Sequence, residues 1–133
     1  MMDWLRRILR PRRHPRHYTT KGVFVIVSPY PYKPEKMEGR KLQILDISEG
    51  GCAFIYNGTK EDLVEAGILC LMDEDSICLE SADFMTVTDK PLPQEKEEAG
   101  WIRRRGVMFK WLGVFDRKRL KEFIKQKSIG RAS

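Results

Sequence analysis

Hydrophobic residues in this chain occur mainly in short runs, separated by acidic residues and by residues that favour turns. Residues 22–28 are rich in β-branched and aromatic side chains and predict a buried strand. Residues 40–47 and 52–56 predict two more strands, and a turn follows the second of these at Asn57 and Gly58. Further strands are predicted over residues 68–72, 76–79, 83–88 and 100–111.

Two helices are predicted, a short one over residues 60–66 and a longer one near the C-terminus. Asp116 is a suitable N-cap for the longer helix, which is expected to continue to about Lys127. Its apolar face consists of Leu120, Phe123 and Ile124. The segment between residues 89 and 100 contains prolines and several glutamates, so it predicts a polar loop.

Many short strands followed by one terminal helix predict a mostly β fold, a small antiparallel β-barrel of six or seven strands with a C-terminal α-helix. No helical segments separate the strands, which argues against a doubly wound parallel sheet. A length of 133 residues is enough for one domain with a modest core. No apolar run approaches the length of a transmembrane helix, and a cytoplasmic location is expected.

The net charge of +6 is confined to the N-terminal segment. Residues 1–21 contain seven lysines and arginines against one acidic residue, whereas the remaining 18 basic and 18 acidic residues cancel. We therefore divide the chain into a basic arm, residues 1–21, and a neutral barrel domain, residues 22–130. The basic isoelectric point is a property of the arm and not of the barrel surface.

The cysteines and histidines argue against a catalytic or metal-binding role. Cys52, Cys70 and Cys78 are odd in number and lack the Cys-x-x-Cys spacing of metal sites, so buried thiols in a reducing compartment are expected. His14 and His17 both lie in the arm, which leaves the barrel without a histidine for a catalytic pair or a metal triad. We expect no enzyme activity, no metal and no cofactor.

The most basic part of the arm is residues 12–18, with the sequence Arg-Arg-His-Pro-Arg-His-Tyr. Pro11 and Pro15 disfavour a helix here, so an extended or kinked segment is predicted. Arg12 and Arg16 are four residues apart, and a bent arm can close both guanidinium groups around one anion. Taken alone, the segment is better explained as a solvated basic run that holds any polyanion loosely.

A second polar motif, Asp46-Ile-Ser-Glu-Gly-Gly51, lies between two predicted strands. Asp46 and Ser48 are two residues apart, so they project from the same side of the chain. An ionised Asp46 accepts hydrogen bonds only, as the ring N–H and amino group of a guanine require, and Ser48 can donate or accept. Gly50 and Gly51 are expected to permit positive φ and a sharp turn close to a ligand. Taken alone, this motif is better explained as an ordinary hairpin turn.

The order of the two motifs changes this interpretation. An Arg-x-x-x-Arg arm, followed about thirty residues later by Asp-x-Ser-x-x-Gly between the next two strands, resembles the PilZ domain family. The C-terminal segments 105–109 and 116–124 are similar to the last strand and closing helix of that family, so the resemblance extends over residues 10–127. PilZ domains are bacterial receptors for the second messenger cyclic di-GMP.

The resemblance implies a binding site and a function. By resemblance the arginines would hold phosphate and contact a guanine, the aspartate and serine would recognise a base edge, and the glycines would form the turn. The residues implied are Arg12, Arg13, Arg16, Asp46, Ser48, Gly50 and Gly51. The implied function is a non-enzymatic receptor that relays cyclic di-GMP occupancy to a protein partner in motility, biofilm or exopolysaccharide control.

Two alternatives stay open. A basic arm on a small barrel with the aromatic residues Phe24, Tyr30, Tyr32 and Phe54 would also suit a binder of single-stranded nucleic acid. The neutral barrel argues against this, because the basic residues Arg103, Arg104 and Arg105 must alternate between the two faces of a strand. The second alternative is a PilZ-like module that contacts proteins without binding a nucleotide.

Overall fold

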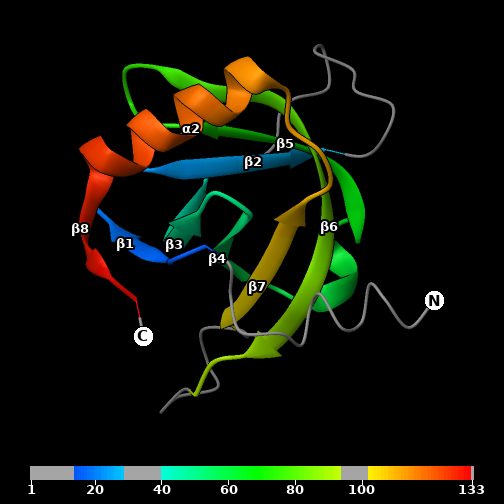
Figure 1. Cartoon of the computed structure of the whole chain (residues 1–133). Coiled ribbons are helices and arrows are strands. Elements are labelled where there is room, and N and C mark those ends of the chain that lie inside the picture. Colours follow the sequence, from blue (N-terminus) through cyan, green and yellow to red (C-terminus); the bar gives the residue numbers. More distant parts are fainter. Residues whose placement is uncertain (1–13, 29–39, 94–101, 133) are drawn as a thin grey trace.

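The computed structural model describes residues 14–28, 40–93 and 102–132, and these form eight strands, one α-helix and a 3₁₀ turn (Figure 1). The elements are β1 (His17–Thr19), β2 (Phe24–Ser28), β3 (Leu42–Ser48), β4 (Gly51–Asn57), η2 (Lys60–Asp62), β5 (Ala66–Met72), β6 (Ile77–Pro91), β7 (Ile102–Phe109), α2 (Val114–Lys127) and β8 (Ser128–Arg131).

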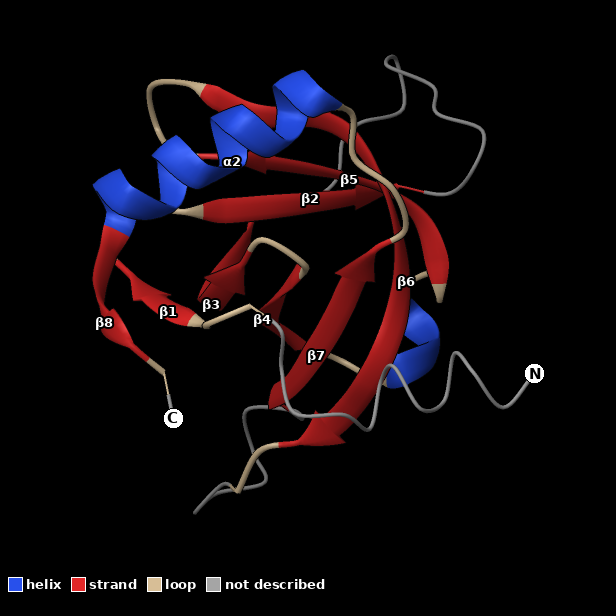
Figure 2. Cartoon of the chain, viewed as in Figure 1, coloured by secondary structure: helices blue, strands red, loops and turns tan. Residues whose placement is uncertain are grey.

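Six of the strands form a closed antiparallel barrel (Figure 2). Their order is β2-β5-β6-β7-β4-β3, and pairing of β2 with β3 closes the ring. The predicted barrel with a C-terminal helix is thus confirmed. Strand β3 changes partner along its length, because Leu42 and Gln43 pair with β2 whereas Asp46 and Ile47 pair with β1. Strand β8 then pairs with the far side of β1.

The helix covers one end of the barrel, above β2 and β5 in Figure 1. The predicted apolar face is confirmed, since Leu120, Phe123 and Ile124 are buried and belong to the same core as the inward side chains of the strands. The predicted N-cap is wrong: the helix begins at Val114 with Gly113 as its N-cap, and Asp116 lies in the first turn. An acidic residue there still interacts favourably with the helix dipole.

Two predicted segments differ from the structure. The runs 76–79 and 83–88 are parts of one strand, β6, which extends through Pro91 into the predicted polar loop. Local irregularities in its pairing with β5 and β7 bend this strand around the barrel, and they interrupt the hydrophobic pattern. The predicted helix over residues 60–66 is only the 3₁₀ turn η2, because Ala66 already belongs to β5.

The three cysteines occupy core positions, as predicted: Cys52, Cys70 and Cys78 are buried free thiols. Burial raises the pKa of Cys52 and Cys70, and it raises the pKa of Cys78 to about 12. Thiols held in the neutral form are poor nucleophiles and poor metal ligands. Within the described residues, no helix is both long and apolar enough to cross a membrane.

The end of the barrel away from the helix contains a buried ionic cluster. Arg105 is fully buried, and its Nε donates to Oδ2 of Asp89 at 2.7 Å. Its Nη1 and Nη2 donate to the backbone carbonyls of Val64 and Lys60, each at 2.8 Å. Asp89 also accepts from Arg103 Nε at 2.5 Å and from the hydroxyl group of a tyrosine in β4. The cluster therefore ties β6 and β7 to the segment around η2.

The Asp89 carboxylate stays ionised in this buried position. Burial by itself opposes ionisation, but the hydrogen bonds from Tyr56, Arg105 and Arg103 outweigh it and lower the pKa of Asp89. The guanidinium group of Arg105 also lies over the ring of Tyr56, 5.4 Å from the ring centroid. Each nitrogen atom of the Arg105 guanidinium group has an acceptor, as a buried charge requires.

A second ion pair fixes the C-terminal end of α2 to the turn between β5 and β6. Lys127 Nζ lies 3.0 Å from Oδ2 of Asp73. The backbone N–H groups of Asp75 and Ser76 each donate to Oδ1 of the same carboxylate at 2.7 Å. The hydrogen bond to Lys127 and those from the turn lower the pKa of Asp73 to about 2.

Stability is therefore expected to depend on Asp73 in a defined pH range. Because the folded-state pKa is depressed, the contribution of Asp73 is fully present above pH 4 and is lost as the pH falls from about 4 towards 2. Asp73→Asn should lower the urea midpoint at pH 7 and leave it near the wild-type value at pH 2. Asp75→Asn, in the same exposed turn, is the control. A gap between Asp73→Asn and wild type that persists undiminished at pH 2 would contradict this assignment.

Candidate ligand-binding site

The structure brings together two of the predicted binding residues. Arg16 comes directly before β1, and the pairing of β1 with β3 places Tyr18 opposite Asp46. Nη1 of Arg16 consequently lies 3.6 Å from Oδ2 of Asp46. Two other predicted residues, Arg12 and Arg13, lie outside the described part of the chain.

A third charged residue, Arg104, contacts the same carboxylate and was not predicted as a site residue. Its Nη2 donates to Oδ2 of Asp46 at 3.2 Å. Arg104 belongs to the Arg103–Arg105 cluster noted in the sequence. The alternation of side chains along that strand was the sequence feature that could have placed Arg104 on the face opposite to its two neighbours. The residues on either side of Arg104 bind Asp89. Arg104 therefore faces the opposite side, where Asp46 lies.

The turn after Asp46 is organised by the hydroxyl group of Ser48. Ser48 Oγ accepts from the backbone N–H of Gly50 at 3.2 Å and donates to the carbonyl of Gly51 at 3.4 Å. The expectation of positive φ at Gly50 and Gly51 is wrong, because among the described residues only Gly22, Gly58 and Gly130 have positive φ. The reason for a glycine at 51 is a close approach of two strands instead.

A side chain at Gly51 would overlap the neighbouring strand β7. A Cβ atom there would collide with the carbonyl oxygen of Val107 and lie 3.0 Å from Cα of Met108. We expect Gly51→Ala to lower the free energy of unfolding by about 2 kcal/mol, since rigid backbone must move. Gly50→Ala is a matched control, because its Cβ would meet side chains alone, the ring of His14 at 3.2 Å and Oγ of Ser48 at 3.9 Å.

Urea denaturation of both glycine variants tests this expectation. The control should stay within about 0.5 kcal/mol of wild type, because the contacting atom belongs to a side chain that can shift. Equal losses in the two variants would show that the approach of β4 to β7 is not what requires a glycine at this position.

The outer face of the barrel beside this turn is lined with small residues. Across the ladder, Asp46 pairs with Ala53 and Ala53 with Gly106, and directly opposite residues point to the same face. In the next row Ser48 pairs with Gly51. The carboxylate and hydroxyl groups of the motif thus border a row of small residues, which we call the shallow floor, and Asp46, Ser48 and Ala53 are all buried.

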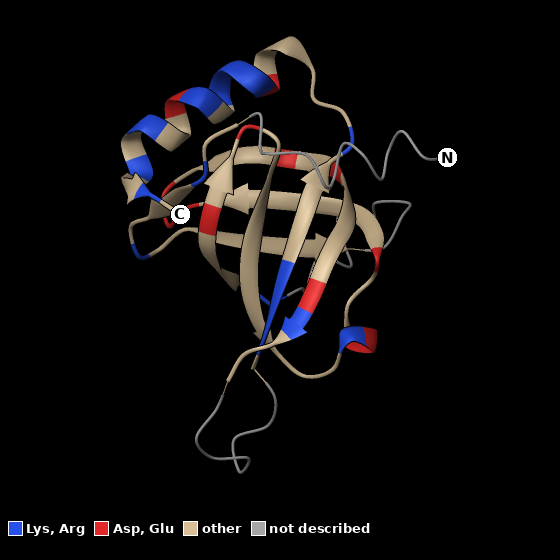
Figure 3. Ribbon diagram, turned by 60° about the horizontal axis from the view of Figure 1, so that its bottom comes forward, with Lys and Arg blue, Asp and Glu red and all other residues tan. Residues whose placement is uncertain are grey.

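A pocket of about 520 Å³ adjoins the turn at Glu49 and Gly50. It lies between the β3–β4 turn, the connection from β7 to α2, and α2 itself. His14 lies over Gly50 at its edge, two residues before Arg16. Lys121 of α2 lies 3.7 Å from a carboxylate oxygen of Glu49 across the pocket. Figure 3 shows that basic residues occur along much of α2.

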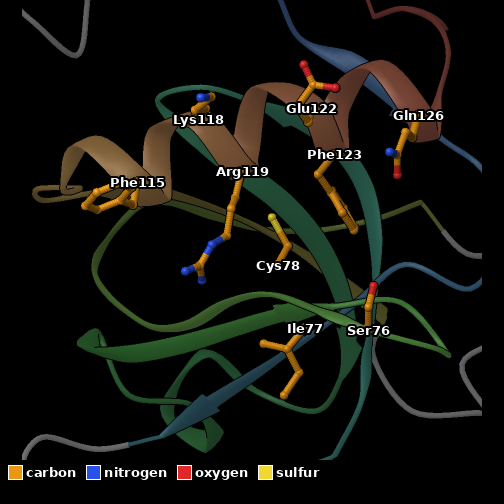
Figure 4. A pocket seen from close by; sticks show the side chains of 9 residues that line it. All are labelled: Ser76, Ile77, Cys78, Phe115, Lys118, Arg119, Glu122, Phe123 and Gln126. Carbon is orange, nitrogen blue, oxygen red and sulfur yellow. The ribbon is translucent and has the colours of Figure 1, made fainter.

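A second pocket, of about 400 Å³, lies between α2 and the start of β6 (Figure 4). Its lining includes Ile77, Cys78, Phe115 and Arg119. None of the residues of the two sequence motifs borders it. The first pocket is therefore the one connected with the predicted site.

No family model and no curated protein matches this sequence. Among solved structures, the PilZ domain of YcgR from Escherichia coli with cyclic di-GMP is 12% identical, with a TM-score of 0.64, over 88% of this chain and 91% of that chain. The chain has the PilZ fold. MrkH from K. pneumoniae in complex with cyclic di-GMP is 17% identical, with a TM-score of 0.64, over 89% of this chain and 52% of that chain.

Another MrkH structure, described as a cyclic di-GMP-dependent transcription regulatory factor, is 20% identical with a TM-score of 0.58. The match extends over 87% of this chain and 50% of that chain. The PilZ-fold chain described here thus spans about half the length of the MrkH chains that it matches. At these identities the likeness concerns the fold, and it confirms the predicted PilZ-like barrel.

Proposed function

We propose that this PilZ-fold chain is a non-enzymatic receptor for cyclic di-GMP that acts in the bacterial cytoplasm. The observation that carries the proposal is the 3.6 Å approach of Arg16 to Asp46. These residues belong to two motifs thirty positions apart, and they meet on a fold whose solved examples include complexes with cyclic di-GMP. The proposed binding residues are Arg12, Arg13, Arg16, Asp46, Ser48, Gly50 and Gly51.

The chemistry of these groups suits both halves of the ligand. An arginine fork forms paired charge-assisted hydrogen bonds with phosphate and can stack on a base. Asp46, when ionised, accepts the two N–H donors of a guanine edge. Arg104 holds Oδ2 of Asp46 at 3.2 Å, which fixes the direction of the carboxylate and leaves its other oxygen for the base. Arg104 therefore joins the proposed site as a positioning residue.

The same geometry offers a route from the ligand to a protein partner. The carbonyl of Arg16 accepts from the backbone N–H of Ala132 at 2.9 Å, and Nδ1 of His17 lies 2.9 Å from Oγ of Ser128. Strand β1 is thus held between β3, which carries Asp46, and the C-terminal strand β8. Movement of Arg16 towards a bound phosphate would change the position of β8, and we propose that a partner recognises this change.

Isothermal titration calorimetry with cyclic di-GMP tests the receptor proposal, with GMP and GTP as controls. We expect binding of cyclic di-GMP that is at least tenfold tighter than that of either control, since neither offers two guanines on one phosphodiester ring. A single-stranded DNA oligonucleotide, titrated at 50 and 200 mM salt, tests the nucleic-acid alternative. Absence of heat with cyclic di-GMP, or salt-sensitive DNA binding without nucleotide preference, would overturn the proposal.

A further inference from the structure

One large aromatic residue next to the proposed site has no role in the core. Trp111 is 74% exposed and lies on the connection between β7 and α2. The far edge of its ring lies close to Gly113, where a Cβ atom would be 3.8 Å from Cη2. Most of the surface of the indole faces water. Exposed tryptophan of this kind is enriched at sites of recognition.

Trp111 forms part of the pocket that adjoins the Ser48–Gly51 turn. Gly50 and His14, at the edge of that pocket, belong to the two motifs that carry the proposed site. The indole therefore borders the same pocket as the turn that follows Asp46. A ligand that extends past the turn from Asp46 would meet the ring of Trp111.

The charges around this pocket favour an anion. Lys110, Arg117 and Lys121 line it, with Glu49 as the acidic residue among its lining. The ion pair of Lys121 with Glu49 is long, at 3.7 Å, and both side chains are exposed. A phosphate can therefore recruit Lys121 at little cost. An aromatic platform with basic groups beside it is the arrangement that binds a base together with its phosphate.

We propose that Trp111 is the stacking platform for the second base of the bound dinucleotide, the base that Asp46 does not contact. Arg117 and Lys121 contribute positive charge beside the adjacent phosphate. This inference rests on the proposed receptor function and adds a subsite that neither sequence motif contains. Stacking makes no use of the hydrogen-bonding edge of the base, so this subsite strengthens binding without selecting guanine.

The test compares three variants in calorimetric titrations with cyclic di-GMP. Trp111→Ala is expected to bind about tenfold more weakly than wild type, and Trp111→Phe, which keeps an aromatic face, should recover most of that loss. Phe115→Ala is the matched control, because Phe115 is an equally exposed aromatic residue, at 78%, that lines the other pocket (Figure 4). It should bind as wild type does.

Tryptophan fluorescence gives an independent readout. Cyclic di-GMP should quench the emission of the wild-type protein, and most of this quenching should be absent in Trp111→Phe, which retains Trp4 and Trp101. Unchanged affinity in Trp111→Ala, or an equal loss in Phe115→Ala, would overturn the subsite and leave the receptor proposal intact. Failure of the wild-type protein to bind cyclic di-GMP would overturn both.

Discussion

Replacing Arg105 by alanine is expected to lower the free energy of unfolding by about 3–5 kcal/mol. The guanidinium group is fully buried, and it satisfies Asp89 and the carbonyls of Val64 and Lys60. Its removal leaves a buried carboxylate with fewer partners and two carbonyl groups without a donor. Typical domains unfold at 5–15 kcal/mol, so this one change would remove a large part of the total stability.

Urea denaturation at pH 7 measures the effect, with Arg119→Ala as the matched control. Arg119 carries the same charge on α2, but its side chain is 62% exposed and lies 4.0 Å from Asp116. We expect the control to change stability by less than about 0.5 kcal/mol. If Arg105→Ala is too unstable to purify, Arg105→Lys can be measured instead. Lysine keeps the charge but loses the planar fork, so the stability of this variant should lie between those of wild type and Arg105→Ala. A loss below 1 kcal/mol in Arg105→Ala would show that the cluster is not structural.

The hydrophobic pattern predicted the barrel because short apolar runs mark most of its strands, and β4 and β5 are buried along nearly their whole length. It could not predict the cluster at Arg105, because an arginine in a strand reads as a solvent-facing position. The side chains of Arg103, Arg104 and Arg105 do alternate between the two faces of the strand. Arg105, however, faces the interior, where the rule predicts a residue facing solvent. Arg105 points into the barrel, and it can do so only because Asp89 on the neighbouring strand points in as well. That partner is sixteen residues away, and the pairing register decides it.

The candidate site, too, could be predicted only in part from the sequence. The order of the two motifs predicted that Arg16 and Asp46 belong to one site, and the pairing of β1 with β3 gives the geometry. Arg104 and Trp111 belong to no motif, and they reach the site through the register of β4 with β7 and the path of the chain into α2. The requirement for glycine at 51 arises from contact between two strands, which a local turn pattern does not contain.

Replacing Arg16 by alanine is expected to weaken the binding of cyclic di-GMP by at least about 100-fold, while the fold is retained. A lost bidentate contact to phosphate accounts for part of this effect, since hydrogen bonds to charged groups contribute about 1.5–3 kcal/mol. The remainder arises because Asp46 loses one of its two neutralising arginines and keeps only Arg104, so its charge repels the approaching phosphates more strongly. Calorimetry with the Arg16→Ala protein, beside Arg119→Ala, measures the loss.

The double variant Arg16→Ala/Asp46→Asn separates these two contributions. If Asp46 repels phosphate once Arg16 is absent, the second substitution should cost much less affinity in the Arg16→Ala background than in wild type, because it also removes the repelling charge. If Asp46 acts only by accepting hydrogen bonds from guanine, the two losses should add. Binding by Arg16→Ala at wild-type affinity would remove the arm from the site altogether, and the shallow floor with its neighbouring pocket would then have to hold the ligand alone.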